Sequence, residues 1–477
     1  SVEDLGLQAY ECQVCAASRE TNQCEISHGV KIDEDFFVKV SSNSKPKSSE
    51  KACCIVELCK LFAQDPFTGI EERQYFNLKE ELALKLIKQF EEVSGSKISN
   101  HIEEASIAST ATWARFCGAA GVDSCDCVNF LNCSGKSGDK GKDNHEEKAT
   151  NYLAKSFHPR SQQLIVDSMK DVGGMIKIIR VKPNPAKGTD KLAFFRAGMH
   201  VNFKLKIGGS VVTRPYCMAS SPARVFDADG GYYEFSIFDV PVEWGGFASD
   251  FIAKNFKEGT EFGISAPRGG LSYSAVRDKS HVLAVAIGSV APFVSMARAI
   301  VDGAEDYKLT ILFEHMPEIA GLYFYELNEL AAKSNGKVRV LHFLPEGSRE
   351  GYITGNISAD DVRKAAGDED YSLFVISTGL PSDQSFEIIK DLGLPKRRWR
   401  KSPVGNMGTD KVVEVLKEQG IEPEAGLSYK GTICVRDKVY EIECPANETI
   451  LCSLERAGIF VPTNCRSGIC GTCRARL

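Results

Sequence analysis

The hydrophobic pattern of the chain changes near residue 280, and this change limits the folds open to it. From Met175 to Tyr273, short β-rich runs alternate with turn residues, which is typical of an antiparallel β-barrel or sandwich. From 280 to 400, apolar runs such as Val282 to Ile287 alternate with helical segments. Continuous apolar runs indicate buried parallel strands, and their alternation with helices indicates a doubly wound α/β sheet. We therefore expect two different sheets in succession.

Changes in composition divide the chain further. The stretch from 134 to 150 is polar and rich in Gly and Lys, which predicts a linker and a domain boundary near residue 150. A second linker, which carries one helix from Lys411 to Gln419, precedes a C-terminal domain. The expected segments are 1–150 (a mostly helical, Cys-rich module), 155–275 (the barrel), 280–401 (the α/β domain), 402–428 (the linker) and 429–477.

Overall composition excludes several classes of protein. The 477 residues are 43% hydrophobic and 26% charged, as in ordinary globular domains. A net charge of −6 provides no basic surface, so nucleic acid is not an expected partner. No apolar run approaches the roughly 18 residues of a membrane-spanning helix, and no signal peptide is recognisable. The first residue is Ser1 rather than Met, which leaves an upstream segment open.

The N-terminal module is rich in cysteine. Seventeen cysteines in a chain of this length fit metal ligation or redox work in the cytoplasm or another reducing compartment better than a secreted disulfide scaffold. Cys12 and Cys15 are the best candidates to hold zinc or an additional iron–sulfur cluster. The alternative is that the thiols are small buried hydrophobes. The other candidates are Cys24, then Cys53, Cys54 and Cys59 near the start of a possible helix, and finally Cys117, Cys125, Cys127 and Cys133.

Two further helices have recognisable boundaries. Phe76 to Val93 is amphipathic, with Asn77 as its N-cap and Leu82, Leu86, Phe90 and Val93 on its apolar face. In the C-terminal domain, a strand pair (431–435 and 439–443) precedes a helix with Ile450, Leu451 and Leu454 as apolar positions. Asn447 is the expected cap of that helix, and Gly458 is expected to end it.

A polar stretch in the barrel segment, Arg214-Pro-Tyr-Cys-Met-Ala-Ser-Ser-Pro222, is suited to a cofactor. Arg214 can grip a phosphate, and Tyr216 can cover a planar ring. Cys217, Ser220 and Ser221 are small enough for a cofactor edge to approach the backbone. The alternative is a polar turn between strands. The stretch resembles the Arg-x-Tyr-Ser/Thr-x-x-Ser/Asn flavin signature of the ferredoxin-NADP reductase superfamily. In that family the Ser meets flavin N5, and here Cys217 takes its place.

A second element follows about thirty residues later, as in that family. Gly245 and Gly246 permit close backbone approach, and Ser249 is expected where a helix begins. Free N–H groups and the helix dipole there would hold a phosphate, unless this is an ordinary capped helix. The loop resembles the pyrophosphate-binding form of the family, which favours FAD over FMN.

The α/β segment departs from the family in three places. The Gly-rich loop reads Ala286-Ile-Gly288-Ser289-Val-Ala-Pro292, where relatives usually have Gly-Gly-Thr-Gly-Ile-Ala-Pro. Glu314 stands where a Gly-x-Arg pattern is usual; its charge suits a ribose hydroxyl and would repel a 2′-phosphate. A Cys-Gly-Pro turn is replaced by Ser377-Thr378-Gly379. The resemblance implies NADH as donor rather than NADPH, while the departures leave open that neither binds.

The strongest motif comes near the end of the chain. Cys465, Cys470 and Cys473 have the C-x4-C-x2-C spacing of the plant-type [2Fe–2S] ferredoxin loop, a domain with the β-grasp fold. The fourth cysteine of that family lies a few tens of residues further on, and this chain stops at Leu477. Either the sequence is truncated, which we favour, or Cys444 or Cys452 is the fourth ligand.

Residues 155–477 resemble reductases of the phthalate dioxygenase reductase or hybrid-cluster-protein reductase kind. The resemblance implies electron transfer from NAD(P)H through a flavin at Tyr216 and Cys217 to a [2Fe–2S] cluster. The implied acceptor is a separate oxygenase, corrinoid protein or hybrid-cluster protein. The alternative is a non-catalytic electron-transfer subunit of a larger complex, with a degenerate nucleotide site. A third hypothesis makes the N-terminal module an enzyme that receives these electrons.

Overall fold

The computed structural model describes much of the chain beyond residue 66 and only short strands before it. The described residues are 24–25, 31–32, 36–42, 54–60, 66–67, 69–103, 105–109, 111–112, 152–207, 209–239, 247–269, 271–377, 382–402, 427–435, 438–446 and 449–459, with single positions 461, 463, 473 and 475. Two compact units result, Ser1–His158 with Ser274–Arg277, and Pro159–Tyr273 with Asp278–Leu477.

The first unit combines strand pairs with one long helix. Strands β1 (Cys24–Glu25) and β2 (Lys31–Ile32) pair antiparallel, as do β3 (Phe36–Ser42) and β4 (Cys54–Lys60). The expectation of a helix near Cys54 and Cys59 was wrong, because both residues lie in β4. The run CIVELCK is short and apolar enough to fit the hydrophobic pattern of a helix or of a strand, and its pairing with β3 makes it a strand. The described residues thus contain strand pairs beside the helix, and the expectation of a mostly helical module is not confirmed.

Helix α1 (Tyr75–Ser94) follows the short helix η1 (Glu72–Gln74). It starts two residues before the expected cap Asn77, and Gln74 precedes it without a capping side chain. Tyr75 is fully buried and stacks on Phe157 at 3.9 Å between ring centroids, so packing determines the start of the helix. Gly95 ends it with φ 72°, the left-handed conformation that favours glycine.

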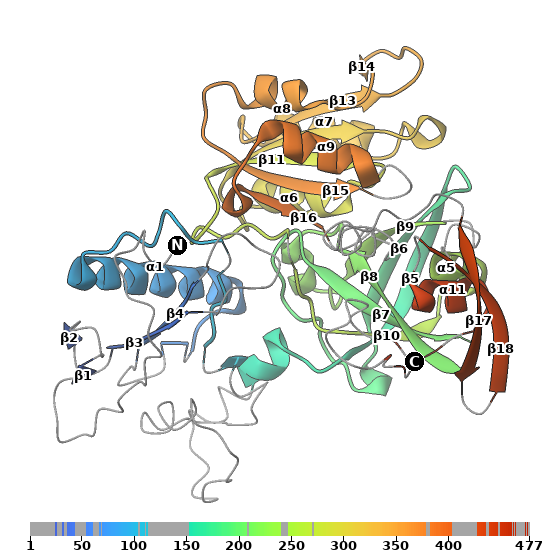
Figure 1. The fold of residues 1–477 in the computed structure, drawn as a ribbon, viewed down its shortest axis with the longest axis horizontal. Coiled ribbons are helices and arrows are strands. Elements are labelled where there is room, and N and C mark those ends of the chain that lie inside the picture. Colours follow the sequence, from blue (N-terminus) through green and yellow to red (C-terminus); the bar gives the residue numbers. More distant parts are fainter. Residues whose placement is uncertain are drawn as a thin grey trace, which may run out of the picture. The chain divides into compact units, whose positions relative to one another are not determined.

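The second unit opens with the expected antiparallel sheet. Its six strands run in the order β8-β7-β10-β5-β6-β9. An isolated antiparallel bridge between Met218 and Phe235 links the two edge strands and closes the sheet into a barrel. Helix α5 (Phe247–Asn255) lies between β9 and β10 in the chain (Figure 1). The strands are β5 (Gln162–Val172), β6 (Ile176–Pro183), β7 (His200–Ile207), β8 (Ser210–Cys217), β9 (Tyr233–Phe238) and β10 (Glu261–Ile264), and the short helices are η2 (Pro185–Lys187) and η3 (Pro222–Phe226).

The parallel α/β sheet follows, in the order β14-β13-β12-β11-β15-β16. Every strand pair is parallel, as the continuous apolar runs predict. The strands are β11 (His281–Ile287), β12 (Lys308–Glu314), β13 (Val338–Leu344), β14 (Ile353–Thr354), β15 (Ser372–Ser377) and β16 (Trp399–Lys401). The helices are α6 (Ala291–Val301), α7 (Phe324–Lys333), α8 (Ala359–Ala366) and α9 (Ser382–Leu392), with η5 (Pro317–Ile319) and η6 (Lys396–Arg398).

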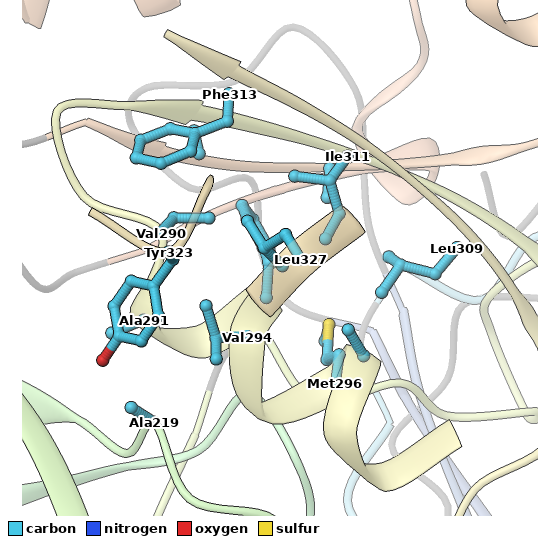
Figure 2. Close-up of a cluster of buried hydrophobic side chains, with 14 of the residues drawn as sticks. Ala219, Val290, Ala291, Val294, Met296, Leu309, Ile311, Phe313, Tyr323 and Leu327 are labelled. Atoms are coloured by element: carbon cyan, nitrogen blue, oxygen red, sulfur yellow. The ribbon is translucent and has the colours of Figure 1, made fainter. Parts of the chain in front are cut away.

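Helices cover both faces of this sheet because its central strand is apolar on both sides. In β11, Val282, Ala284 and Ala286 contribute to one hydrophobic cluster, and the alternate residues contribute to another. The first cluster includes α6 and α7, and the second includes α8 and α9. Figure 2 shows the first cluster, in which Val294 and Leu327 lie beneath the side chain of Ile311. This packing holds the carboxyl ends of the strands at one edge of the sheet.

The C-terminal segment contains a hairpin and a helix. Strands β17 (Ser428–Val435) and β18 (Lys438–Pro445) pair antiparallel, and α11 (Ile450–Arg456) follows (Figure 1). The expected cap Asn447 was wrong. Thr449 caps α11, since its hydroxyl accepts a hydrogen bond from the backbone N–H of Cys452 at 3.2 Å. The expected linker helix, 411–419, lies outside the described residues.

Candidate functional site

Arg214 lies in β8, and its guanidinium is held on two sides. Nη1 donates to the backbone carbonyl of Thr213 at 2.9 Å. Nη2 lies 2.6 Å from Oε2 of Glu455 in α11, and the two side chains are 12% and 4% exposed. A guanidinium carries five N–H donors in a planar fork, so these two contacts set its direction without using all of it. The orientation of Arg214 therefore depends on the barrel and the C-terminal segment together.

Tyr216 and Cys217 end the same strand. Tyr216 is half-buried and packs on Phe203 at 4.7 Å between ring centroids; burial raises the pKa of its hydroxyl, although Arg214 opposes this. Cys217 is buried, and burial raises the pKa of its thiol to about 12 against an opposing hydrogen bond with Ser402. At neutral pH, Cys217 is therefore a protonated thiol, which is a weak hydrogen-bond donor.

The two serines after this strand are directed into the protein. The Ser220 hydroxyl accepts from the backbone N–H of Glu234 at 3.1 Å, while the Ser220 carbonyl accepts from the Ser295 hydroxyl at 2.7 Å. Ser221 caps η3 by accepting from the N–H of Ala223. Both serines are almost fully buried. Their hydroxyls stabilise the turn that follows β8 and connect it to β9, while the Ser220 carbonyl connects it to α6.

The turn between β11 and α6 contains the predicted nucleotide loop. Gly288 has φ 76°, a conformation that favours glycine, and its N–H donates to the carbonyl of Glu314 at 3.1 Å. Ser289 is half-buried, and Pro292 lies in the first turn of α6, where proline is favoured. The loop is thus tied to the carboxyl end of the neighbouring strand β12.

The Glu314 side chain is also engaged within the protein. Its Oε2 accepts hydrogen bonds from the N–H of Ile357 at 2.8 Å and from Nε2 of Gln384 at 2.7 Å. Its Oε1 accepts a longer bond, 3.3 Å, from Nδ2 of Asn356. The carboxylate is buried and joins β12 to the residues before α8 and to α9. This structural role was not expected from the sequence.

Other predicted site residues are described in part or not at all. Ser249 is buried in α5, two residues after the first residue of the helix. Cys473 is half-buried, while Cys465, Cys470 and Gly246 lie outside the described residues, as do Thr378 and Gly379. Of the N-terminal cysteines, only Cys24, Cys54 and Cys59 fall within described strands. Within the described ranges, no group of three His, Cys, Asp or Glu residues could hold a metal ion.

Comparison with known proteins identifies the C-terminal segment and the body of the chain. Residues 434–477 match the 2Fe-2S iron-sulfur cluster binding domain. The ferredoxin reductase component of 3-ketosteroid-9-alpha-monooxygenase from Rhodococcus rhodochrous is 23% identical over 293 residues, 61% of this chain and 78% of that protein. The glycine betaine monooxygenase reductase subunit of Pseudomonas aeruginosa is 24% identical over 294 residues, 59% of this chain and 77% of that protein. Residues 434–477 therefore match a [2Fe–2S] domain, and the body of the chain is similar to ferredoxin reductase components of oxygenase systems.

Among solved structures, phthalate dioxygenase reductase matches this chain with a TM-score of 0.42 and 19% identity, over 66% of this chain and 85% of that one. In the described part of the chain, none of the helices combines the length and apolar character needed to cross a membrane.

Arg298 connects the antiparallel and the parallel sheet, which the sequence analysis missed. From α6, its Nη1 donates to the carbonyl of Ala219 at 2.8 Å and to Oε1 of Glu234 at 2.7 Å, and its Nε donates to Glu326 at 2.6 Å. Glu234 is buried in β9, which raises the pKa of its carboxyl, but Arg298 and Arg180 together hold that pKa below its usual value. The sequence signal that could have identified this contact is a single arginine in a largely apolar helix (APFVSMARAIV), because a buried arginine needs a partner.

A buried histidine pair beside Glu314 was also missed. Nδ2 of Asn328 donates to the carbonyl of Phe324 and lies 3.1 Å from Nε2 of His342. His342 Nε2 is therefore the acceptor, and its Nδ1–H donates to Nε2 of His315 at 2.8 Å. Burial lowers the pKa of His342 to about 4, and burial with the charges of His342 and Arg349 lowers that of His315 to about 3. Both rings are neutral at neutral pH.

Proposed function

We propose that this reductase takes electrons from NADH, passes them through FAD to its [2Fe–2S] cluster, and delivers them singly to an oxygenase. The observation that carries the proposal is the match of residues 434–477 to a 2Fe-2S domain at the end of a reductase chain. A nicotinamide gives up two electrons at once, and a [2Fe–2S] cluster accepts one. A bound flavin supplies the conversion, and the protein supplies binding and orientation.

For the flavin, the residues of β8 offer suitable groups. Arg214 would bind a phosphate, since it is a cation whose guanidinium is already oriented. Tyr216 would cover the ring, and the protonated Cys217 thiol would donate weakly to flavin N5. Gly246 and Ser249 would hold the second phosphate of FAD near α5. FMN would need only the first phosphate.

The parallel sheet would bind NADH at the carboxyl end of β11. Gly288, Ser289 and Pro292 form the turn there, where nucleotides bind in sheets of this kind. Glu314, at the neighbouring strand end, disfavours a 2′-phosphate by its charge, which supports NADH over NADPH. Cys465, Cys470 and Cys473 would ligate the cluster.

An oxygenase is the favoured electron acceptor. Both relatives reported above are named as reductase parts of monooxygenases. Neither is named as the reductase of a corrinoid or hybrid-cluster protein, so those two partners have less support.

An anaerobic titration tests the proposal. Flavin and iron are first quantified, and FAD is separated from FMN by chromatography. NADH should then bleach the flavin band and next the cluster band, and NADPH should require a much higher concentration. A protein without flavin and iron, or one whose flavin NADH does not reduce, contradicts the proposal.

The second candidate is an electron-transfer subunit with a degenerate nucleotide site. It is favoured by the full engagement of Glu314 with Ile357, Gln384 and Asn356, because a carboxylate held by three donors is less suited to a ribose. In that case dithionite reduces both cofactors and NADH reduces neither, and further subunits purify with the chain.

A further inference from the structure

The C-terminal segment contacts the flavin-binding strand through two independent sets of bonds. The first is the ion pair between Nη2 of Arg214 in β8 and Oε2 of Glu455 in α11, at 2.6 Å. The second joins the stretch after α11 to the same strand. The N–H of Thr213 donates to Oγ1 of Thr463 at 3.1 Å, and Oγ1 of Thr213 donates to the carbonyl of Thr463 at 2.8 Å. The N–H of Thr463 donates to the carbonyl of Val211 at 3.3 Å.

These contacts have the character of a specific interface. Arg214 and Glu455 are largely removed from water, and Thr213 and Thr463 are both buried. Separating a buried ion pair leaves an uncompensated charge in the interior, which favours the arrangement that keeps Arg214 and Glu455 together. Thr213 donates twice to Thr463, from its N–H and from its hydroxyl, and the N–H of Thr463 donates back to the same strand at Val211. An incidental contact between neighbouring segments would not need both.

We propose that Glu455 and Thr463 latch the [2Fe–2S] domain onto β8 and thereby position the cluster for electron transfer from the flavin. The latch consists of Arg214, Glu455, Thr213 and Thr463. The contacts between these residues are observed, whereas their role in electron transfer depends on the proposed function. Glu455 and Thr463 are positioning residues, because they act through β8 and the cluster loop.

The position of the latch in the chain supports this role. Thr463 precedes the cluster cysteine Cys465 by two residues, a reach of at most about 7 Å. Thr213 precedes Tyr216 by three residues, a reach of at most about 10 Å. The latch is therefore close along the chain to both cofactor sites, and loosening it would lengthen the route of the electron. In the positioned step, the reduced flavin loses one electron and the oxidised cluster gains it. The second electron follows when the external acceptor has taken the first.

Thr463→Val is the main test, because it removes one hydroxyl and nearly preserves shape, and Thr463→Ser is its matched control. Stopped-flow spectroscopy of the anaerobic protein follows the flavin and cluster bands after NADH is added. In Thr463→Val we expect an unchanged rate of flavin reduction and a cluster reduction rate about tenfold lower, the factor that corresponds to one hydrogen bond. Thr463→Ser should keep the wild-type rate.

Glu455→Gln provides a second test, with Glu441→Gln as a control on an exposed residue of β18. Hydrogen–deuterium exchange of the β8 peptide, read by mass spectrometry, reports the latch directly. Exchange in the β8 peptide should be faster in Glu455→Gln and in Thr463→Val, and unchanged in both controls. Iron content and the electron paramagnetic resonance spectrum of the reduced cluster should equal those of the wild type, which a general loss of folding would not leave intact.

The outcomes separate the latch from the proposed function. Wild-type exchange in both Thr463→Val and Glu455→Gln, or wild-type cluster reduction in both, overturns the latch. Should the wild-type protein hold no flavin, the proposed function fails, while faster exchange in the variants still supports the latch. If Glu455→Gln assembles no cluster, Thr463→Val decides.

Discussion

The barrel and the parallel sheet of this chain place the residues of their proposed sites in different ways. In the barrel, these residues lie within a strand and just beyond it, as Arg214 and Ser220 show. In the parallel sheet, the central strand β11 is buried along its whole length, and the residues of the proposed site, Gly288 and Glu314, lie where the strands end. The site of the barrel can therefore be recognised from a short sequence motif within one strand. The site of the parallel sheet lies in loops, whose sequence can change while the fold is kept.

This difference also determines what a mutation should do. A polar side chain in β8 has partners from distant segments, so its loss affects folding and cofactor binding together. The polar side chain of Glu314, at the end of a parallel strand, has its partners within the same α/β domain, just before α8 and in α9. Its loss should affect one edge of the sheet, since the apolar core between the helices remains.

Arg214→Ala should have the largest effect on stability. It leaves Glu455 buried without its cation, and breaking such a pair costs about 3–5 kcal/mol. Urea unfolding measures this, and flavin content should fall in parallel. The control is Arg363→Ala, whose partner Asp360 is 73% exposed and whose own side chain is 51% exposed, so that its loss should cost less than about 1 kcal/mol. Equal effects of the two variants would show that the buried pair in the barrel strand contributes no more to stability than an exposed pair.

Glu314→Leu tests the corresponding position in the parallel sheet. Removing the carboxylate leaves the N–H of Ile357 and the amide of Gln384 without their acceptor, which should cost about 3 kcal/mol in total. Glu314→Gln keeps one acceptor oxygen and should cost less. The KM for NADH, measured with both variants, separates the two roles of this residue. An unchanged KM in Glu314→Gln shows that Glu314 serves the fold and does not contact the ribose.

The sheets themselves could be predicted because their patterns are long. The run Val282 to Ile287 predicted β11, and the pattern from Phe76 to Val93 predicted α1, each within one residue at either end. Short or competing signals were less reliable. The run that became β4 fits both periods, and Asn447 and Thr449 are both good caps.

The contacts of the site residues could not be read from the sequence. The motif pointed to Arg214, but nothing in it indicates a partner 241 residues later at Glu455 (455 minus 214). Likewise, Glu314 was a plausible ribose ligand by position, and only the packing of α9 reveals Gln384 beside it. Tertiary partners decide whether a polar side chain serves a ligand or the fold, and they leave no local pattern.

The histidine pair of the parallel sheet predicts how stability depends on pH. In the folded protein, the pKa of His342 is about 4 and that of His315 about 3, below the usual 6.5. The unfolded chain therefore binds more protons below pH 6.5, and the free energy of unfolding falls as the pH drops towards 4. Each histidine should contribute about 2 kcal/mol to this fall between pH 6.5 and pH 5.

His342→Gln should reduce the decrease in the free energy of unfolding between pH 6.5 and pH 5 by the contribution of one histidine. Urea titrations at the two pH values measure this. The control is His101→Gln in the first unit, an exposed position that should leave the fall unchanged. A wild-type pH dependence in His342→Gln would mean that the buried pair is already protonated in the folded protein.

Cys217→Ser should have the smallest effect, although it lies at the centre of the proposed flavin site. The thiol has a pKa of about 12, so it stays protonated at working pH, and serine preserves a protonated donor next to Ser402. We expect a stability change of less than about 1 kcal/mol. The rate of flavin reduction by NADH should have the same pH profile in both proteins between about pH 6 and pH 9. Cys217→Ala, which removes the donor, is the comparison that measures what the donor contributes. A pH inflection that is present in the wild type and missing in Cys217→Ser would show instead that this position holds a thiolate. The barrel strand would then supply an ionisable group to the flavin.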